Sequence, residues 1–346
     1  MKPVWLFLTC TFVFIVLIQV AGDNLPATDP FDDARPDTPQ DLRGYGVRQI
    51  ALLKLRHVAK RNRPYDVGLF GNSRILAMRG ADLELNGCSV FNYALSGQSF
   101  RSSVRLLERL ADVKRLPRNA IISVDHFELQ VAGNPIWIGW RQRLGAVIND
   151  VEGILGWRRA DLRNRLRIVW RYIWTETLVF RGQFEVSYFR RAVVDAFALN
   201  DTPFQAVSAG QRGYLKDGSH PGASPKLEKF GVLPRNTSQI IEAVFRDDLE
   251  RLFTLAQRND MKLFLYESPL HPASNDVYAK APSPFARDAR RNMRQVCSKY
   301  GVTCTSVPAT IFHGGAKWTD ATHPPGASLG RWVGDVLRPT LRGCLQ

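Results

Sequence analysis

Short apolar segments and longer amphipathic segments alternate along most of this chain. Five segments of five to seven residues, most of them largely apolar, are predicted to be strands, and they cover 66–70, 89–95, 120–124, 262–266 and 302–307. Segments with apolar residues at helical spacing lie beside these runs, at 49–58, 75–83, 102–114, 284–300 and around 329–337. Strands that alternate with helices predict an α/β fold with a doubly wound, mostly parallel five-stranded sheet.

The first apolar segment is longer than the others. Residues 4–20 are nearly all apolar, and about 17 helical residues approach the thickness of a bilayer's hydrocarbon core. Lys2 precedes the run and acidic residues follow it, which places the N-terminus in the cytoplasm. We therefore expect residues 1–22 to form a transmembrane helix that anchors the chain in the inner membrane by a single pass. Val20-Ala21-Gly22 also fits a cleavage site, so a cleaved signal peptide stays open.

The rest of the chain divides by composition into a linker and a folded domain. Residues 23–43 are acidic and rich in proline, without apolar periodicity, which is typical of an extended linker. The domain covers 44–346, and a helical insertion rich in Trp and Arg interrupts its pattern at 130–235. The insertion is either a carbohydrate groove, with aromatic rings on sugars and guanidinium groups on carboxylates, or a packed lid with a charged outer face.

Charge narrows the expected partners. The formal net charge is +15 and the isoelectric point is about 9.9. Such a charge suits nucleic acid, but an exported chain rarely meets it, so we expect no nucleic-acid partner. An anionic or neutral polysaccharide of the cell envelope, or a phospholipid surface, fits an extracytoplasmic, periplasmic domain better.

The cysteines agree with export. Cys10 lies in the apolar run, and the other four of the five cysteines would meet an oxidising compartment. Cys297 stands near the end of a predicted helix and Cys304 in the strand that follows, so this pair is the expected disulfide. The alternative is two reduced, buried thiols.

Polar residues collect where the predicted strands end. Gly71-Asn72-Ser73-Arg74 follows the first strand, Ser96-Gly97 the second, and Asp125 the third. Ligands of open α/β sheets bind beyond the carboxyl ends of the strands, so these residues should converge. Ser73 opens a helix after a tight turn, where backbone N–H groups can stabilise an oxyanion. The alternative is that Ser73 only caps this helix.

A second motif, Asp320-Ala-Thr-His323, stands near the C-terminus. Its spacing lets one turn present a carboxylate and an imidazole together. The carboxylate would orient the imidazole, which would take the proton of Ser73 and return it to the leaving group. The alternatives are a solvated loop histidine and an aspartate that caps the next helix. The other histidines lack the spacing of metal ligands, so we expect no metal.

The motifs GNSR, ALSG and DATH, in this order, resemble those of the SGNH (GDSL-like) hydrolase superfamily over roughly 66–125 and 262–337. The resemblance implies a flavodoxin-like sheet, no cofactor, Ser73 as nucleophile, His323 as base, Asp320 as its orienting carboxylate, and the N–H groups of Ser73 and Gly97 as oxyanion donors. The chain departs from the pattern in two places: Asn72 stands where many relatives have aspartate, and Asp125 follows the third strand where the family has asparagine.

Four further residues are candidates for the site: Asn72, Arg74, Asn92 and Asp125. Asn92 has an alternative role, because its amide could satisfy backbone groups between strands. Asp125 and the neighbouring His126 could belong to a hydrogen-bonded network at the strand end.

The resemblance also indicates a function. Anchored superfamily members that act in polysaccharide O-acetylation and teichoic-acid alanylation combine one N-terminal membrane segment with this domain, often beside a membrane-bound O-acyltransferase. It implies an extracytoplasmic enzyme that transfers an acetyl-like group to, or removes it from, an envelope polysaccharide through an acyl-Ser73 intermediate. Two alternatives stay open: a free esterase or lipase-like hydrolase, and a non-catalytic envelope scaffold or polysaccharide-binding subunit that keeps the fold.

Overall fold

The structure is a computed structural model of the chain. It describes residues 29–31, 42, 47–96, 98–124, 162–163, 166, 214–220, 239–269, 271, 284–312, 318 and 323–339. The predicted anchor, the linker between 32 and 41 and most of the insertion lie outside these residues. Within them, no helix has the length and apolar character needed to cross a membrane.

By its internal contacts the chain divides into two compact units. One comprises Met1–Asp29, Leu42–Leu53 and Pro135–Phe204, and the other Pro30–Asp41, Lys54–Asn134 and Gln205–Gln346. The second unit holds the sheet, Ser73 and His323. The first described helix, α2 (Val47–Lys60), begins in one unit and continues into the other.

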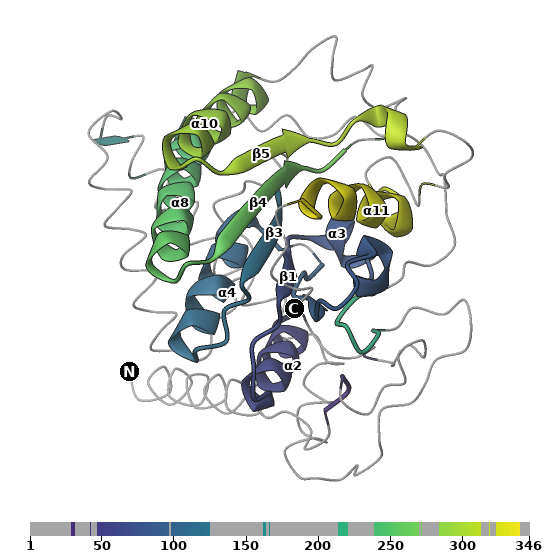
Figure 1. The fold of residues 1–346 in the computed structure, drawn as a ribbon. Coiled ribbons are helices and arrows are strands. Elements are labelled where there is room, and N and C mark those ends of the chain that lie inside the picture. Colours follow the sequence, from purple (N-terminus) through teal and green to yellow (C-terminus); the bar gives the residue numbers. More distant parts are fainter. Residues whose placement is uncertain are drawn as a thin grey trace, which may run out of the picture. The chain divides into compact units, whose positions relative to one another are not determined.

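Five parallel strands form the central sheet (Figure 1). In spatial order they are β2 (Val90–Asn92), β1 (Val67–Phe70), β3 (Asn119–Val124), β4 (Lys262–Glu267) and β5 (Thr303–Ser306). Every residue of β1 is buried, which explains its continuous apolar sequence. This 2-1-3-4-5 order is a doubly wound arrangement, so the predicted α/β fold with a five-stranded parallel sheet is confirmed.

Three long helices cover one face of the sheet (Figure 1): α4 (Phe100–Asp112), α8 (Gln239–Arg258) and α10 (Pro284–Tyr300). The rings of Phe253 and Tyr300 stack 4.9 Å apart where α8 meets α10. The sequence patterns predicted α4 and α10, but α8 was not expected.

The other face carries α3 (Ser73–Leu76), the 3-10 helix η1 (Gly80–Leu83) and α11 (Gly326–Leu337) (Figure 1). Trp332 of α11 lies against Phe264 of β4, with ring centroids 6.2 Å apart. A second 3-10 helix, η2 (Ala309–Phe312), follows β5.

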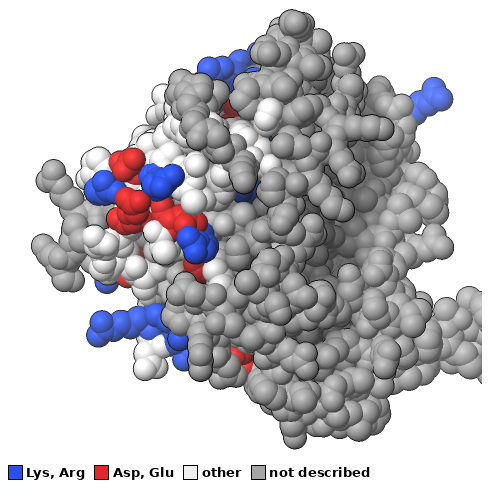
Figure 2. All heavy atoms as spheres, turned by 90° about the vertical axis from the view of Figure 1, so that its right-hand side faces the viewer, with Lys and Arg blue, Asp and Glu red and all other residues white. Residues whose placement is uncertain are grey.

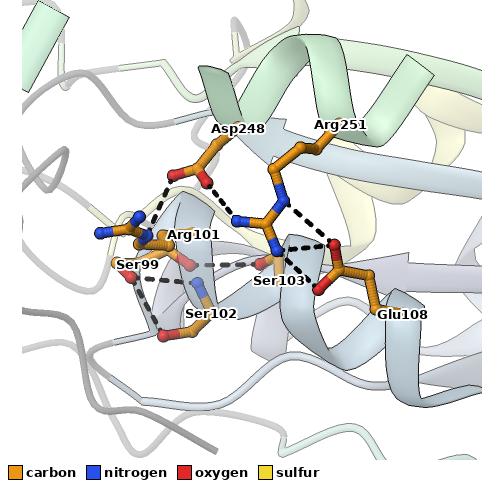
Figure 3. Close-up of polar contacts among 7 residues, drawn as sticks. All are labelled: Ser99, Arg101, Ser102, Ser103, Glu108, Asp248 and Arg251. Atoms are coloured by element: carbon orange, nitrogen blue, oxygen red, sulfur yellow. Dashed lines mark hydrogen bonds and ion pairs between the residues drawn. The ribbon is translucent and has the colours of Figure 1, made fainter. Parts of the chain in front are cut away.

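Ion pairs fasten α4 to α8 (Figure 3). Arg251 binds Glu108 at 2.7 Å and Asp248 at 3.4 Å, and Arg101 approaches the same Asp248 at 3.5 Å. Asp248 is buried, and these two guanidinium groups offset part of the cost of burying its carboxylate. Ser99 begins α4 by accepting a hydrogen bond from the Ser102 amide.

The single helix expected over 75–83 is wrong, because the chain forms two short helices, α3 and η1, with a break at 77–79. The side-chain amide of Asn92 donates to the carbonyl oxygens of Ile75 and Met78, both at 2.9 Å. The Asn92 side chain thus satisfies two carbonyl groups that would otherwise need the backbone N–H groups of a continuous helix.

The expected disulfide joins Cys297 to Cys304, with Cα atoms 6.2 Å apart. It ties the last turn of α10 to β5. Cys88 is disulfide-bonded as well.

Lys54 of α2 is a buried cation at the end of β2. Its ammonium donates to three carbonyl oxygens, those of Asn92 at 2.7 Å, Ala94 at 2.8 Å and Gly218 at 2.7 Å. Burial lowers the pKa of Lys54 well below its usual range, and the charge of Asp217 acts in the opposite direction. An ammonium has three N–H donors, and all three are used here. Lys54 thus joins α2, the end of β2 and the segment around Gly218.

We predict that Lys54→Met lowers the free energy of unfolding by about 3 kcal/mol, because it leaves buried carbonyl groups without donors. Urea denaturation of the full chain measures this. Lys60→Met, at an exposed position of the same helix, is the control and should change stability by less than about 0.5 kcal/mol. Equal stability of the two variants would contradict the structural role of Lys54.

Candidate active site

The turn after β1 is shaped by one glycine and one asparagine. Gly71 has φ +142°, and a Cβ there would lie 2.9 Å from Cβ of Ser123, so glycine is required. Asn72 is extended, and its side chain accepts a hydrogen bond from the Arg74 amide at 2.9 Å. Asn72 rather than Ser73 therefore caps α3. The hydroxyl of Ser73 is left for other contacts.

Ser73 and His323 lie side by side although 250 residues separate them in sequence. Ser73 Oγ is 2.7 Å from His323 Nε2, and both side chains are partly exposed. The segment after His323 is held closely, because a Cβ on Gly326 would lie only 2.4 Å from the carbonyl oxygen of Ala77. The close approach of α11 to α3 thus sets where His323 stands.

Three of the predicted site residues, Asp320, Gly97 and Asp125, lie outside the described residues. The roles assigned to them remain predictions.

Trp318, two residues before Asp320, is described and buried. Its ring packs against those of Phe312, 4.9 Å away, and His271, 5.3 Å away, in edge-on geometry. These contacts hold the start of the segment that leads to His323.

Asn92 has a structural role in the site rather than a catalytic one. It is fully buried, and besides donating to Ile75 and Met78 it accepts from the Ala94 amide at 3.0 Å. Both ends of the side-chain amide are therefore used inside the protein. Asn92 fixes the end of α3, the helix that Ser73 begins, which agrees with the alternative considered from the sequence.

Polar groups line the adjoining strand ends of β3 and β4. Ser123 and Ser268 share a hydrogen bond of 2.5 Å between their Oγ atoms. Burial raises the pKa of Tyr266 well above its usual range, while the charge of Arg74 acts in the opposite direction. Arg74 is itself buried, so its positive charge lies one residue from Ser73 in a region with little water.

One carboxylate at this edge is held in place by a cation. Glu267, the last residue of β4, binds Arg290 of α10 through both carboxylate oxygens at 2.9 Å and accepts from Ser306 Oγ at 3.2 Å. These contacts occupy Glu267, so it is positioned as a structural link between β4, β5 and α10.

Residues 214–220, inside the predicted insertion, also belong to the surroundings of α3. The backbone N–H of Asn92 donates to the carbonyl oxygen of Asp217 at 2.7 Å, and the backbone N–H of His220 donates to the carbonyl oxygen of Leu76 at 2.9 Å. The sequence patterns did not predict that this segment lies beside β2 and α3. Its Asp-Gly pair signals a turn, but nothing in the pattern shows that the turn borders β2.

A cavity of about 640 Å³ opens at the opposite edge of the sheet. It is lined by residues from the starts of β3, β4 and β5 and from the ends of α8 and α11, and neither Ser73 nor His323 is among them. The chemistry suggested by the Ser73–His323 pair therefore does not belong to this cavity. No cluster of side chains suited to a metal ion occurs within the described ranges.

No protein-family model matches the sequence, and a search of curated proteins finds no match. What this site does must therefore be inferred from its own geometry. A hydroxyl that donates to an imidazole can be deprotonated as it attacks an electrophile, which is the first step of nucleophilic catalysis by serine.

We predict that Asn92→Asp lowers the free energy of unfolding by about 3 kcal/mol, because a buried carboxylate would face carbonyl oxygens. Thermal or urea denaturation of the full chain measures the effect. Asn62→Asp, at an exposed position, is the matched control and should be nearly neutral. If Asn92→Asp kept full stability, the bonds to Ile75 and Met78 would not be what Asn92 provides.

Proposed function

We propose that the protein is a serine acyl-ester enzyme that uses Ser73 as nucleophile and His323 as general base. The observation that carries the proposal is the 2.7 Å contact between Ser73 Oγ and His323 Nε2. Ser73 needs no hydroxyl bond to cap α3, since Asn72 does so. The likeness of three motifs to the SGNH superfamily supports the same assignment.

The reaction has two halves. In the first, Ser73 Oγ attacks the acyl carbon while its proton passes to His323 Nε2, the bond to the leaving alcohol breaks, and the imidazole returns the proton to that alcohol. In the second, a sugar hydroxyl or water gives up its proton to His323 and attacks the acyl-serine, the bond between the acyl carbon and Ser73 Oγ breaks, and the imidazole returns the proton to Ser73 Oγ. Asp320 would hold the imidazole with Nδ1 protonated, and the N–H groups of Ser73 and Gly97 would stabilise the oxyanion.

We place this activity outside the cytoplasm, on a polysaccharide of the cell envelope. The Cys297–Cys304 disulfide supports an oxidising compartment, and the apolar segment 4–20 supports a membrane anchor. The net charge of +15 favours an anionic partner, although Figure 2 shows acidic and basic side chains close together on the face it draws. A membrane-bound O-acyltransferase would supply the acyl group.

Transfer and hydrolysis differ only in what attacks the acyl-serine. With an acetylated donor, an added polysaccharide that becomes acetylated indicates transfer, whereas free acetate alone indicates an esterase. A non-catalytic scaffold would give neither product and would bind polysaccharide in a salt-sensitive way.

A fluorophosphonate probe tests the activated serine. We predict that the wild-type full chain is labelled and that Ser73→Ala and His323→Ala each lose at least about 99% of the labelling rate, because the nucleophile and its base act as one unit. Gel fluorescence measures the rate.

Ser298→Ala, at an exposed position of α10, controls for labelling of other serines and should react as the wild type does. All variants are compared by their unfolding curves. Absence of labelling in folded wild-type protein would contradict the proposal and favour the scaffold.

A further inference from the structure

The side-chain amide of Gln98 is buried without a hydrogen-bond partner. Only 2% of the residue is exposed, and neither Oε1 nor Nε2 has a partner within the described part of the chain. An amide that gives up water without replacing its hydrogen bonds destabilises the folded state. Buried polar groups in this condition are uncommon in proteins, and a ligand that completes their bonds is one explanation.

The residues that follow Gln98 differ from it in this respect (Figure 3). Ser99 Oγ accepts from the Ser102 amide at 3.2 Å, Ser103 Oγ donates to the Ser99 carbonyl at 3.4 Å, and Arg101 pairs with Asp248. Hydrogen bonds of Ser99 and Ser103 and the ion pair of Arg101 thus fix the start of α4. Both polar atoms of the Gln98 side chain lack such a partner within the described part of the chain.

Backbone hydrogen bonds place Gln98 at the edge of the sheet that carries Ser73. The backbone N–H of Gln98 donates to the carbonyl oxygen of Leu95, and the backbone N–H of Leu95 donates to the carbonyl oxygen of Gly71, both at 3.2 Å. Gly71 precedes Ser73 by two residues. The turn that holds Gln98 and the turn that holds Ser73 are thus bonded neighbours.

We propose that Gln98 is a substrate-binding residue of the Ser73 site, an inference that rests on the proposed function. A carboxamide offers N–H donors and an acceptor oxygen, so the ligand that completes it must supply both an acceptor and a donor. An acylated sugar does so, since its ester carbonyl accepts from Nε2 and a neighbouring hydroxyl donates to Oε1. Gln98 therefore selects sugar esters over esters that carry no hydroxyl.

Protection of Ser73 from the fluorophosphonate probe tests this on the full chain. The competing ligands are a methyl glycoside with one O-acetyl group and cyclohexyl acetate, which has no hydroxyl. We expect the glycoside to protect the wild type at lower concentration. In Gln98→Met, its half-protecting concentration should rise roughly 10- to 100-fold and the preference over cyclohexyl acetate should vanish. Each variant is compared with its own unprotected labelling rate.

Stability gives a second readout with the opposite sign. Gln98→Met and Gln98→Leu remove a buried amide that lacks partners, so their Tm should rise by about 2–4 °C even as binding weakens. Gln295→Met, at an exposed position of α10, should change neither property. A residue that only supports the fold would lower Tm when replaced.

The outcomes separate the two proposals. If the wild type is labelled at Ser73 but the glycoside gives no protection, or protects Gln98→Met equally well, the role of Gln98 is rejected while the serine enzyme stands. A lower Tm in both Gln98 variants also rejects it. A folded wild type that is not labelled rejects the proposed function and the role of Gln98 with it.

Discussion

The candidate site depends on the position of β1 inside the parallel sheet. Because β1 pairs with β2 on one side and β3 on the other, the turn that follows it emerges where the chain connections diverge, which is where open α/β sheets bind ligands. Gly71 lets this turn pass close to Ser123, and Asn72 caps the short helix that begins at Ser73. With α11 packed against this helix, His323 meets a serine 250 residues earlier in the chain.

Buried polar side chains hold the surrounding segments in place. Lys54 ties α2 to the end of β2 and to Gly218, and Asn92 ties β2 to the end of α3. Each uses its full set of donors on backbone carbonyls, which makes the arrangement specific, since replacing either side chain would leave several carbonyls unpaired. Gln98, in the same region, has no such side-chain bonds within the described part of the chain. Lys54 and Asn92 thus position the site, whereas Gln98 has the binding role that we propose for it.

The sequence predicted the sheet and much of the site because both depend on short-range patterns. Short segments beside the helical patterns predicted all five strands, and Ser73 and His323 stood at a strand end and before an amphipathic helix. The break between α3 and η1 could not be predicted, because Asn92, which accounts for it, comes from another strand. Helix α8 was missed although Leu249, Leu252, Phe253 and Ala256 have helical spacing. Lys54 lies in a helical segment that the sequence predicted, and only the tertiary contacts show it to be buried.

The central claim is that Ser73 and His323 act as one catalytic unit, and a double-mutant cycle tests it most directly. The second-order rate of hydrolysis of an activated acetyl ester would be measured for the wild type, Ser73→Ala, His323→Ala and the double variant. If the two side chains share one step, the double variant should be no slower than the slower single variant. Losses that multiply, or single variants that retain the wild-type rate, would contradict the account.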